Sequence, residues 1–402
     1  MERVQEESRS KCYEDDVRSK IKIMTAIVKP SMLAMLGGGQ LGRFFVVSAQ
    51  KLGYQVTVLD PDPNSPAGKL ADVHLCQKYD DQDALDIIIK TCKAASTEFE
   101  NIPAKTLECL QKAIIVRPSA YAVSIAQNRI LEKSFLKKNN FPVGDFKVIE
   151  TVNDIKSVDS SLFPAILKIA QFGYDGKGQI HVNNMEELNR AFTQFKLQPC
   201  VLEKKLNLHT EVSVVMARSN DDKKVFYPLI ENKHVNGILD NSTIPANIDK
   251  KLSECARDIA DRLSTALEYV GVMAVEFFIA NGSIFVNEIA PRPHNSGHFS
   301  LDACLNNQFD QQVRALVGLP LVDTSIHSKA IMVNLLGDVW FQGDQLISHP
   351  FEEIKAENIA IHLYGKKDPR RGRKMGHFTV TGDDLKEILS TVKLIRAKLS
   401  MS

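Results

Sequence analysis

The sequence has few of the features that mark a secreted, membrane-spanning or nucleic-acid-binding protein. Its seven cysteines are scattered without a C-x-x-C pair, which argues against a disulfide framework or a metal knuckle and predicts a reducing, cytoplasmic location. No apolar run reaches the length of a membrane span, and the net charge of +1 gives no footprint for nucleic acid. Residues 1–30 mix charges and lack the apolar core of a secretory signal, so we interpret them as a mobile extension.

The most informative stretch is GVMAVEFFIANGSIFVNEIAPRPHNSGH at residues 271–298. It predicts a β-hairpin, because two apolar runs flank an Asn-Gly dipeptide. Each run carries one carboxylate, Glu276 or Glu288. Burying two like charges is costly unless a cation lies between them, and such oxygens suit Mg²⁺ with phosphates completing its shell. A three-residue turn would place Glu276 opposite Glu288, whereas a two-residue turn would place Asn287 there and leave Glu288 as a diagonal neighbour.

A Gly-rich turn opens the chain's first predicted domain. Residues 32–60 read as strand, turn, helix and strand, and three glycines within residues 37–42 satisfy G-x-G-x-x-G. Because such a turn lets a phosphate approach a helix N-terminus, one interpretation is an NAD site with Asp60 on a ribose. The motif is weak evidence for NAD, since many doubly wound domains share it. Glu98 and Glu100 end a later strand, where open α/β sheets bind ligands; a solvated loop is the equal alternative.

A second Gly-rich segment follows a strand that contains a lysine. Lys168 lies inside the apolar run PAILKIA at 164–170, where a lysine is rarely structural unless paired, so it is a candidate phosphate ligand. GYDGKGQ at 173–179 comes next and precedes another short strand. A Gly-rich loop between strands can cover the phosphates of a nucleotide, so we expect residues 172–178 to be mobile without one. The alternative is an ordinary hairpin turn.

The order of these motifs resembles the ATP-grasp superfamily and, more closely, the family of 5-(carboxyamino)imidazole ribonucleotide synthases. The resemblance covers nearly the whole chain from about residue 32. GYDGKGQ and NEIAPRPHNSGH carry it, and YGKKDPRRGRKMGH at 364–377 matches the family's final signature. It implies an α/β and α+β multidomain protein, with an ATP-grasp fold and an N-terminal Rossmann-like domain. The expected units after the extension are a Rossmann-like pre-ATP-grasp domain (31–128), a lid (129–207), a metal and ATP subdomain (208–324) and a C-terminal substrate-phosphate unit (325–402).

The resemblance also implies roles for individual residues. ATP would be held by Arg129, Lys168, Gly173, Tyr174, Asp175, Gly176, Lys177, Gly178, Gln179, Glu203, Lys204, Lys205, Leu206, Glu211, His234, Asn287 and Glu288. Mg²⁺ would be held by Glu276 and Glu288. Aminoimidazole ribonucleotide would contact Gln40, Leu41, Glu98, Asn295, Lys366, Arg373 and Lys374, while Arg292 and His294 would face bicarbonate and the intermediate.

The reaction that the resemblance implies needs positioning and charge neutralisation more than covalent catalysis. Bicarbonate would attack the γ-phosphate of ATP to give carboxyphosphate and ADP. The exocyclic amine of the ribonucleotide would then capture the carboxyl group, either directly or as CO₂ released in the site. The resemblance further suggests a homodimer.

Two other functions compete with this interpretation. The formate-dependent glycinamide ribonucleotide transformylases share the N-terminal turn, R-P-H and a late Gly-Lys, but have Glu where Gln40 stands and Asp where Asn295 stands. A carboxylate suits their substrate amine better than an amide does, so Gln40, Asn295 and the GYDGKGQ loop favour the synthase. An NAD-dependent oxidoreductase would rest on the first turn alone, and would leave Glu276 and Glu288 unexplained.

Overall fold

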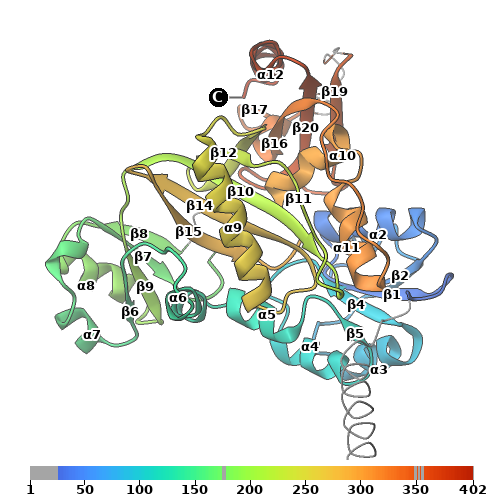
Figure 1. Cartoon of the computed structure of the whole chain (residues 1–402), viewed down its shortest axis with the longest axis horizontal. Helices are drawn as coiled ribbons and strands as arrows, with labels where there is room; N and C mark the ends of the chain where they lie inside the picture. Colours follow the sequence, from blue (N-terminus) through green and yellow to red (C-terminus); the bar gives the residue numbers. More distant parts are fainter. Residues whose placement is uncertain (1–25, 174–177, 348–350, 352–353, 355–356, 402) are drawn as a thin grey trace, which may run out of the picture.

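The computed structural model describes residues 26–173, 178–347, 351, 354 and 357–401. Figure 1 shows four sheet-containing regions, with the amino-terminal sheet and a small lid sheet on either side of a large central sheet. Within the described residues, no helix combines the length and the apolar character needed to cross a membrane. The predicted combination of α/β and α+β architecture is confirmed.

The amino-terminal region is a doubly wound parallel sheet in the order β3-β2-β1-β4-β5. Its elements are β1 (Met32–Leu36), α2 (Gln40–Lys51), β2 (Gln55–Leu59), β3 (Val73–Leu75), α3 (Gln82–Thr91), β4 (Ala94–Thr97), α4 (Ala104–Gln111), β5 (Ile115–Val116) and α5 (Ala120–Ala126). Apolar side chains fill both faces of the sheet, as a buried parallel sheet requires. At the end of the expected extension, the backbone N–H of Ile27 donates to the carbonyl of Val317 at 2.8 Å.

The lid region is a small antiparallel sheet in the order β6-β9-β7-β8. It comprises α6 (Arg129–Lys138), β6 (Phe146–Ile149), α7 (Val152–Lys156), η1 (Ser160–Leu162), β7 (Ala165–Ile169), β8 (Gln179–Val182), α8 (Met185–Gln194) and β9 (Cys200–Lys204). Helices α7 and α8 contribute to its apolar core with residues such as Ile155, Leu188 and Phe192. Residues 174–177 of the Gly-rich loop, on which the prediction of mobility rests, lie outside the described residues.

The central sheet runs on into the carboxy-terminal region. Its strands follow the order β15-β14-β10-β12-β13-β16-β20-β19, with β11 paired to β10. The elements are β10 (Leu208–Arg218), β11 (Lys224–Phe226), β12 (Ile230–Val235), β13 (Ile238–Ile244), α9 (Lys250–Ala266), β14 (Gly271–Ala280), β15 (Ser283–Ala290), η2 (Asn295–Phe299), α10 (Ser300–Ala303), α11 (Gln308–Val317), β16 (Lys329–Leu336), η3 (Gly337–Trp340), β17 (Phe341–Gln342), β18 (Gln345–Leu346), β19 (Ile359–Leu363), β20 (Lys374–Gly382) and α12 (Leu385–Lys398).

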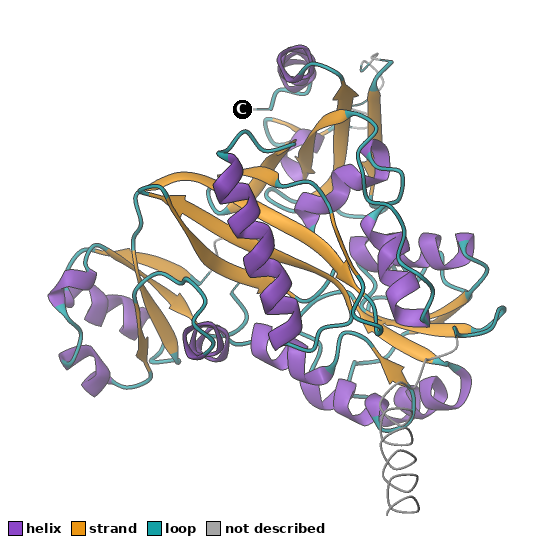
Figure 2. Ribbon diagram, viewed as in Figure 1, coloured by secondary structure: helices purple, strands orange, loops and turns teal. Residues whose placement is uncertain are grey.

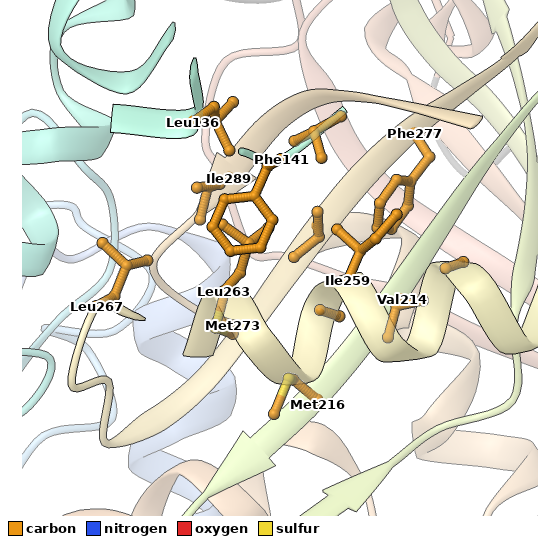
Figure 3. Packing of buried hydrophobic residues seen from close by; sticks show 14 of the residues in the cluster. Leu136, Phe141, Val214, Met216, Ile259, Leu263, Leu267, Met273, Phe277 and Ile289 are labelled. Carbon is orange, nitrogen blue, oxygen red and sulfur yellow. The ribbon is translucent and has the colours of Figure 1, made fainter. Parts of the chain in front are cut away.

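Helices α9 and α11 pack against this sheet. Helix α9 lies across the sheet (Figure 2), and the buried side chains of Ile259 and Leu263 pack there among Met273 and Phe277 (Figure 3). Helix α11 packs against α2, and its Val313 belongs to the apolar core of the amino-terminal region. Helix α11 therefore contributes to the core of the amino-terminal region and also lies against β14 of the central sheet.

The predicted hairpin is present, and its register combines features of both alternatives. Ala280 pairs with Ser283, so the Asn-Gly turn has two residues, and both turn residues have positive φ (50° and 71°). A β-bulge at Asn287 then shifts the register, so that Glu276 pairs directly with Glu288. A bulge places two residues of one strand opposite one residue of its partner. The opposed carboxylates therefore depend on the bulge as well as on the turn.

Candidate functional site

The residues of the predicted site meet in one cleft of about 600 Å³ between the amino-terminal region, the lid and the central sheet. Most of the predicted residues line it. They are Gln40, Leu41, Glu98, Arg129, Lys168, Gly173, Gly178, Gln179, Glu211, His234, Glu276, Asn287, Glu288, Arg292, His294, Asn295 and Lys374. Segments that are far apart in the sequence therefore form a single chemical environment.

Each of the two opposed glutamates contacts a basic side chain from another part of the chain. Glu276 Oε1 lies 3.1 Å from His294 Nε2, and Glu288 Oε2 lies 3.2 Å from Arg129 at the start of α6. Burial alone would raise the pKa of Glu276, but the hydrogen bond and charge of His294 keep it below its usual range. Glu276 is therefore ionised at neutral pH and able to ligate a hard cation.

The strand lysine is paired, as its position in an apolar run requires. Lys168 Nζ lies 3.1 Å from Glu203 Oε2, and Lys133 Nζ lies 3.4 Å from the same oxygen. Burial acts to raise the pKa of Glu203, but Lys168 and its neighbours lower it to about 2. Two lysines around one carboxylate leave a local excess of positive charge. An anionic phosphate near Lys168 would balance that excess.

Arg292, in the loop that follows the hairpin, pairs with a carboxylate from the amino-terminal region. Arg292 Nε donates to Glu100 Oε2 at 2.6 Å. Burial tends to raise the pKa of Glu100, but the guanidinium of Arg292 lowers it to about 2. His294 is held at both nitrogens, with Ser296 Oγ 2.9 Å from Nδ1 and Glu276 at Nε2. Each of the two predicted catalytic side chains is thus oriented by a glutamate from another part of the chain, and His294 also by the nearby Ser296.

The G-x-G-x-x-G turn does not have the arrangement of a dinucleotide site. The carboxylate of Glu98 accepts hydrogen bonds from the backbone N–H groups of Gly39 and Leu41 at the N-terminus of α2. Asp60, the expected ribose ligand, accepts from Gly38 N–H and from the Tyr79 hydroxyl, each at 2.7 Å. The groups that would bind pyrophosphate and ribose are therefore engaged within the protein. This corrects the NAD alternative.

Two amides in the cleft have unsatisfied polar atoms. Both side-chain polar atoms of Asn295, and Oδ1 of Asn287, are buried without a hydrogen-bond partner among the described residues. Buried polar groups are nearly always hydrogen-bonded in folded proteins. Both residues line the cleft, where a bound ligand would supply the missing partners.

Several predicted residues lie elsewhere. Glu203 and Lys204 end strand β9 of the lid, and Lys205 and Leu206 follow it. None of these four residues is part of the cleft lining, and neither are Lys366 and Arg373. Lys366 donates to the carbonyl of Lys374 at 2.7 Å, and Arg373 Nη1 donates to the carbonyl of Asp368 at 2.8 Å. Tyr174, Asp175, Gly176 and Lys177 lie outside the described residues.

Sequence reasoning missed two charged residues in α6. Lys133 Nζ donates to the carbonyl of Asn287 at 2.8 Å, and Glu132 accepts from the backbone N–H of Ile289 at 2.6 Å. Burial raises the pKa of Glu132 to about 8. Both residues are almost completely buried. The signal in the sequence was that both charges lie within about one turn of the predicted ATP ligand Arg129, on the same helix.

Three family models match successive parts of the chain. They are the ribonucleotide synthetase preATP-grasp domain (31–127), the ATP-grasp domain (134–309) and the phosphoribosylaminoimidazole carboxylase C-terminal domain (330–391). The chain is 37% identical over 363 residues to N5-carboxyaminoimidazole ribonucleotide synthase of Brucella melitensis, a match that covers 88% of this chain and 97% of that protein. It is also 37% identical to the synthase of Bacillus subtilis, over 87% of this chain and 91% of the relative.

Solved structures agree with these sequence matches. The Staphylococcus aureus N5-carboxyaminoimidazole synthetase complexed with ADP has a TM-score of 0.85 and 37% identity, over 94% of this chain and 99% of that one. The synthase from Aspergillus clavatus, in complex with ADP and 5-aminoimidazole ribonucleotide, has a TM-score of 0.84 and 30% identity, over 92% and 99%. The chain belongs to the N5-carboxyaminoimidazole ribonucleotide synthase family of the ATP-grasp superfamily.

Proposed function

We propose that the protein carboxylates 5-aminoimidazole ribonucleotide on its exocyclic amine, using ATP and bicarbonate, in purine biosynthesis. The products are N5-carboxyaminoimidazole ribonucleotide, ADP and phosphate. One observation carries the proposal: the paired carboxylates Glu276 and Glu288, the buried Lys168 and the oriented Arg292 and His294 line a single cleft. The relatives from Brucella melitensis and Bacillus subtilis support it. Both are named as synthases of this kind, and the matches cover 97% and 91% of their lengths.

The nucleotide end of the cleft is built for phosphoryl transfer. An oxygen of bicarbonate bonds to the γ-phosphorus of ATP as the bond to the ADP oxygen breaks. Lys168 and Arg129 bring positive charge to the transferred group, which is the main requirement of such a step. His234 and Glu211, 2.9 Å apart, line the same cleft.

We also propose Mg²⁺ as the cofactor. Glu276 and Glu288 would hold it, because the register sets their carboxylates opposite each other and hard oxygen donors are what Mg²⁺ prefers. When bound, it would neutralise charge on the phosphates. Arg129 and His294, which pair with these carboxylates, would then turn toward substrate oxygens.

The acceptor end of the cleft has groups suited to a neutral amine and to a carboxyl group. Arg292 presents a planar fork to the carboxyl oxygens. Asn295, Gln40 and Lys374 line the same cleft and would fix the ribonucleotide. The amine nitrogen then bonds to the carboxyl carbon, phosphate leaves, and the proton lost from nitrogen passes to that phosphate.

The deciding experiment is an ATPase assay with two substrate pairs. ADP formation with aminoimidazole ribonucleotide and bicarbonate, and none with glycinamide ribonucleotide and formate, is expected. Turnover with only the second pair would overturn the proposal. We further propose a homodimer and a cytoplasmic location; light scattering of the purified protein and fractionation of cells test these two points.

A further inference from the structure

A cluster of metal-ligating side chains lies outside the cleft, where three elements meet. Asp302 comes from α10, His362 from β19 and His377 from β20. His362 Nε2 lies 2.8 Å from Asp302 Oδ1, and one ligand atom of each residue lies within 4.8 Å of the other two. None of the three is in the lining of the cleft.

The cluster has polar atoms without partners in the protein interior. Asp302 Oδ2 and His377 Nε2 are buried, and neither has a hydrogen-bond partner among the described residues. His377 is fully buried, and Asp302 is partly buried. Because buried polar atoms without partners cost free energy, two of them in one cluster of metal-ligating residues indicate a missing ligand.

The surroundings hold the two imidazoles in place. Their rings are stacked, with centroids 4.7 Å apart and planes inclined by 21°. The Tyr364 hydroxyl lies 3.0 Å from His377 Nδ1, the kind of outer contact that fixes the orientation of a metal-binding histidine. Phe44 and His298 close the opposite side, with ring centroids 6.1 and 4.8 Å from that of His377.

We propose that Asp302, His362 and His377 bind a transition-metal cation such as Zn²⁺, separately from the Mg²⁺ pair. Two imidazoles and one carboxylate suit Zn²⁺ better than Mg²⁺. At metal–ligand distances of about 2.0–2.2 Å, donor atoms lie roughly 3.3–3.5 Å apart. Metal binding would therefore lengthen the 2.8 Å contact between His362 and Asp302 and shorten separations that approach 4.8 Å. The side chain of His362 is 27% exposed, which gives the ion an entry route.

A metal at this site would join strands β19 and β20 to helix α10, close to residues that line the substrate cleft. Helix α10 follows directly after η2, which carries Asn295, and β20 begins at Lys374. Both residues line the cleft. A metal that joins α10 to β19 and β20 would therefore fix the relative position of two residues that we assign to the ribonucleotide. Metal binding itself does not depend on the proposed reaction.

The experiment uses the full chain after removal of metals with a chelator. Zn²⁺ is titrated calorimetrically in the presence of millimolar Mg²⁺, which fills the glutamate pair, and the melting temperature is followed in parallel. We expect one Zn²⁺ per chain with a dissociation constant at or below about the micromolar range and a rise in melting temperature. Co²⁺ should give the visible absorption of a low-coordinate nitrogen and oxygen site.

Two ligand variants and two matched controls make the assignment specific. Asp302→Asn keeps the shape of the carboxylate, and His362→Ala removes a partly exposed ring; each should weaken Zn²⁺ binding by about a hundredfold or more. His327→Ala alters an exposed histidine, and Cys76→Ser removes a thiol that lies 3.5 Å from a His74 ring nitrogen. Both controls should bind Zn²⁺ like the parent. Absence of stoichiometric binding, or equal binding by the ligand variants when circular dichroism shows that they are folded, would overturn the site.

Discussion

At the scale of single residues, the charges of the cleft come as pairs. Within the described residues, the ion pairs that join residues of the predicted site to another part of the chain include Glu276–His294, Glu288–Arg129, Lys168–Glu203 and Arg292–Glu100. Pairing offsets the cost of removing each charge from water. Substrate and metal binding must exchange these partners, so removing one member has consequences for the other.

The first prediction concerns the glutamate pair. Glu288→Gln keeps the side-chain shape but removes one charge from the proposed Mg²⁺ shell, so turnover should fall by about a hundredfold or more. Glu276→Gln should behave similarly. The side chain of Glu288 is 35% exposed, so the melting temperature should change little. Steady-state rates at saturating Mg²⁺ measure the effect, with Glu254→Gln on exposed α9 surface as the control; near-normal turnover would remove Glu288 from the site.

The second prediction assigns Glu100 a positioning role. Glu100→Gln leaves Arg292 in place but replaces its charged partner with an amide, so the guanidinium is less firmly oriented. We expect kcat to fall by about tenfold or more, while the KM for ATP stays within about twofold. Glu108→Gln, an exposed glutamate on the same domain, is the matched control. A parallel rise in the KM for ATP would show a general disturbance instead of a local one.

The third prediction concerns the carboxy-terminal signature. We expect Arg373 and Lys366 to reach the 5′-phosphate of the ribonucleotide, and each donates to a backbone carbonyl of the same segment. If Arg373 reaches the phosphate, Arg373→Ala should cost about 2–5 kcal/mol of ribonucleotide binding and leave ATP binding within about twofold. Titration of each ligand separately measures this, with the neighbouring exposed Arg371→Ala for comparison. Equal losses for both ligands would return Arg373 to a structural role in the turn.

At the scale of elements, local sequence patterns predicted the helices and strands better than they predicted how the strands pair. The hairpin and the first strand-turn-helix unit appear where the apolar runs and turn residues placed them. The register of the hairpin could not be predicted, because the bulge at Asn287 has no distinct sequence signature.

The fourth prediction concerns Gly178, the last residue of the Gly-rich loop before β8. Gly178 has φ +76°, and a Cβ there would lie 2.5 Å from Ile169 Cδ1. Gly178→Ala should therefore raise the KM for ATP and lower stability by about 1 kcal/mol. Gly144→Ala is the control, since its Cβ would meet only Leu206 at 3.8 Å. Kinetics measured with ATP varied, beside thermal melts, separate the two effects; a loss of stability with an unchanged KM would mean a purely structural glycine.

At the scale of the whole molecule, the sheet crosses the boundary expected at residue 325. Strand β13 pairs with β16, which pairs with β20, so the carboxy-terminal unit extends the central sheet. The sequence suggested where each motif lies but not this continuity, because strand pairing over such separations depends on tertiary packing. The cleft residues were identified mainly through motif resemblance. Their partners Glu100, Glu132 and Lys133 became clear only when the elements were placed together.

The last prediction tests whether the carboxy-terminal unit can be removed. A chain that ends at residue 324 loses β16 and exposes the whole edge of β13, whose Ile244 and Leu239 are buried beside Met332. It also loses the ion pair between Asp240 and Arg396, in which two hydrogen bonds measure 2.9 and 3.0 Å. Because an exposed apolar sheet edge promotes association, we expect the truncated chain to aggregate on expression. Gel filtration and thermal unfolding measure this, and a soluble monomer that unfolds cooperatively would show that the region before residue 325 folds independently.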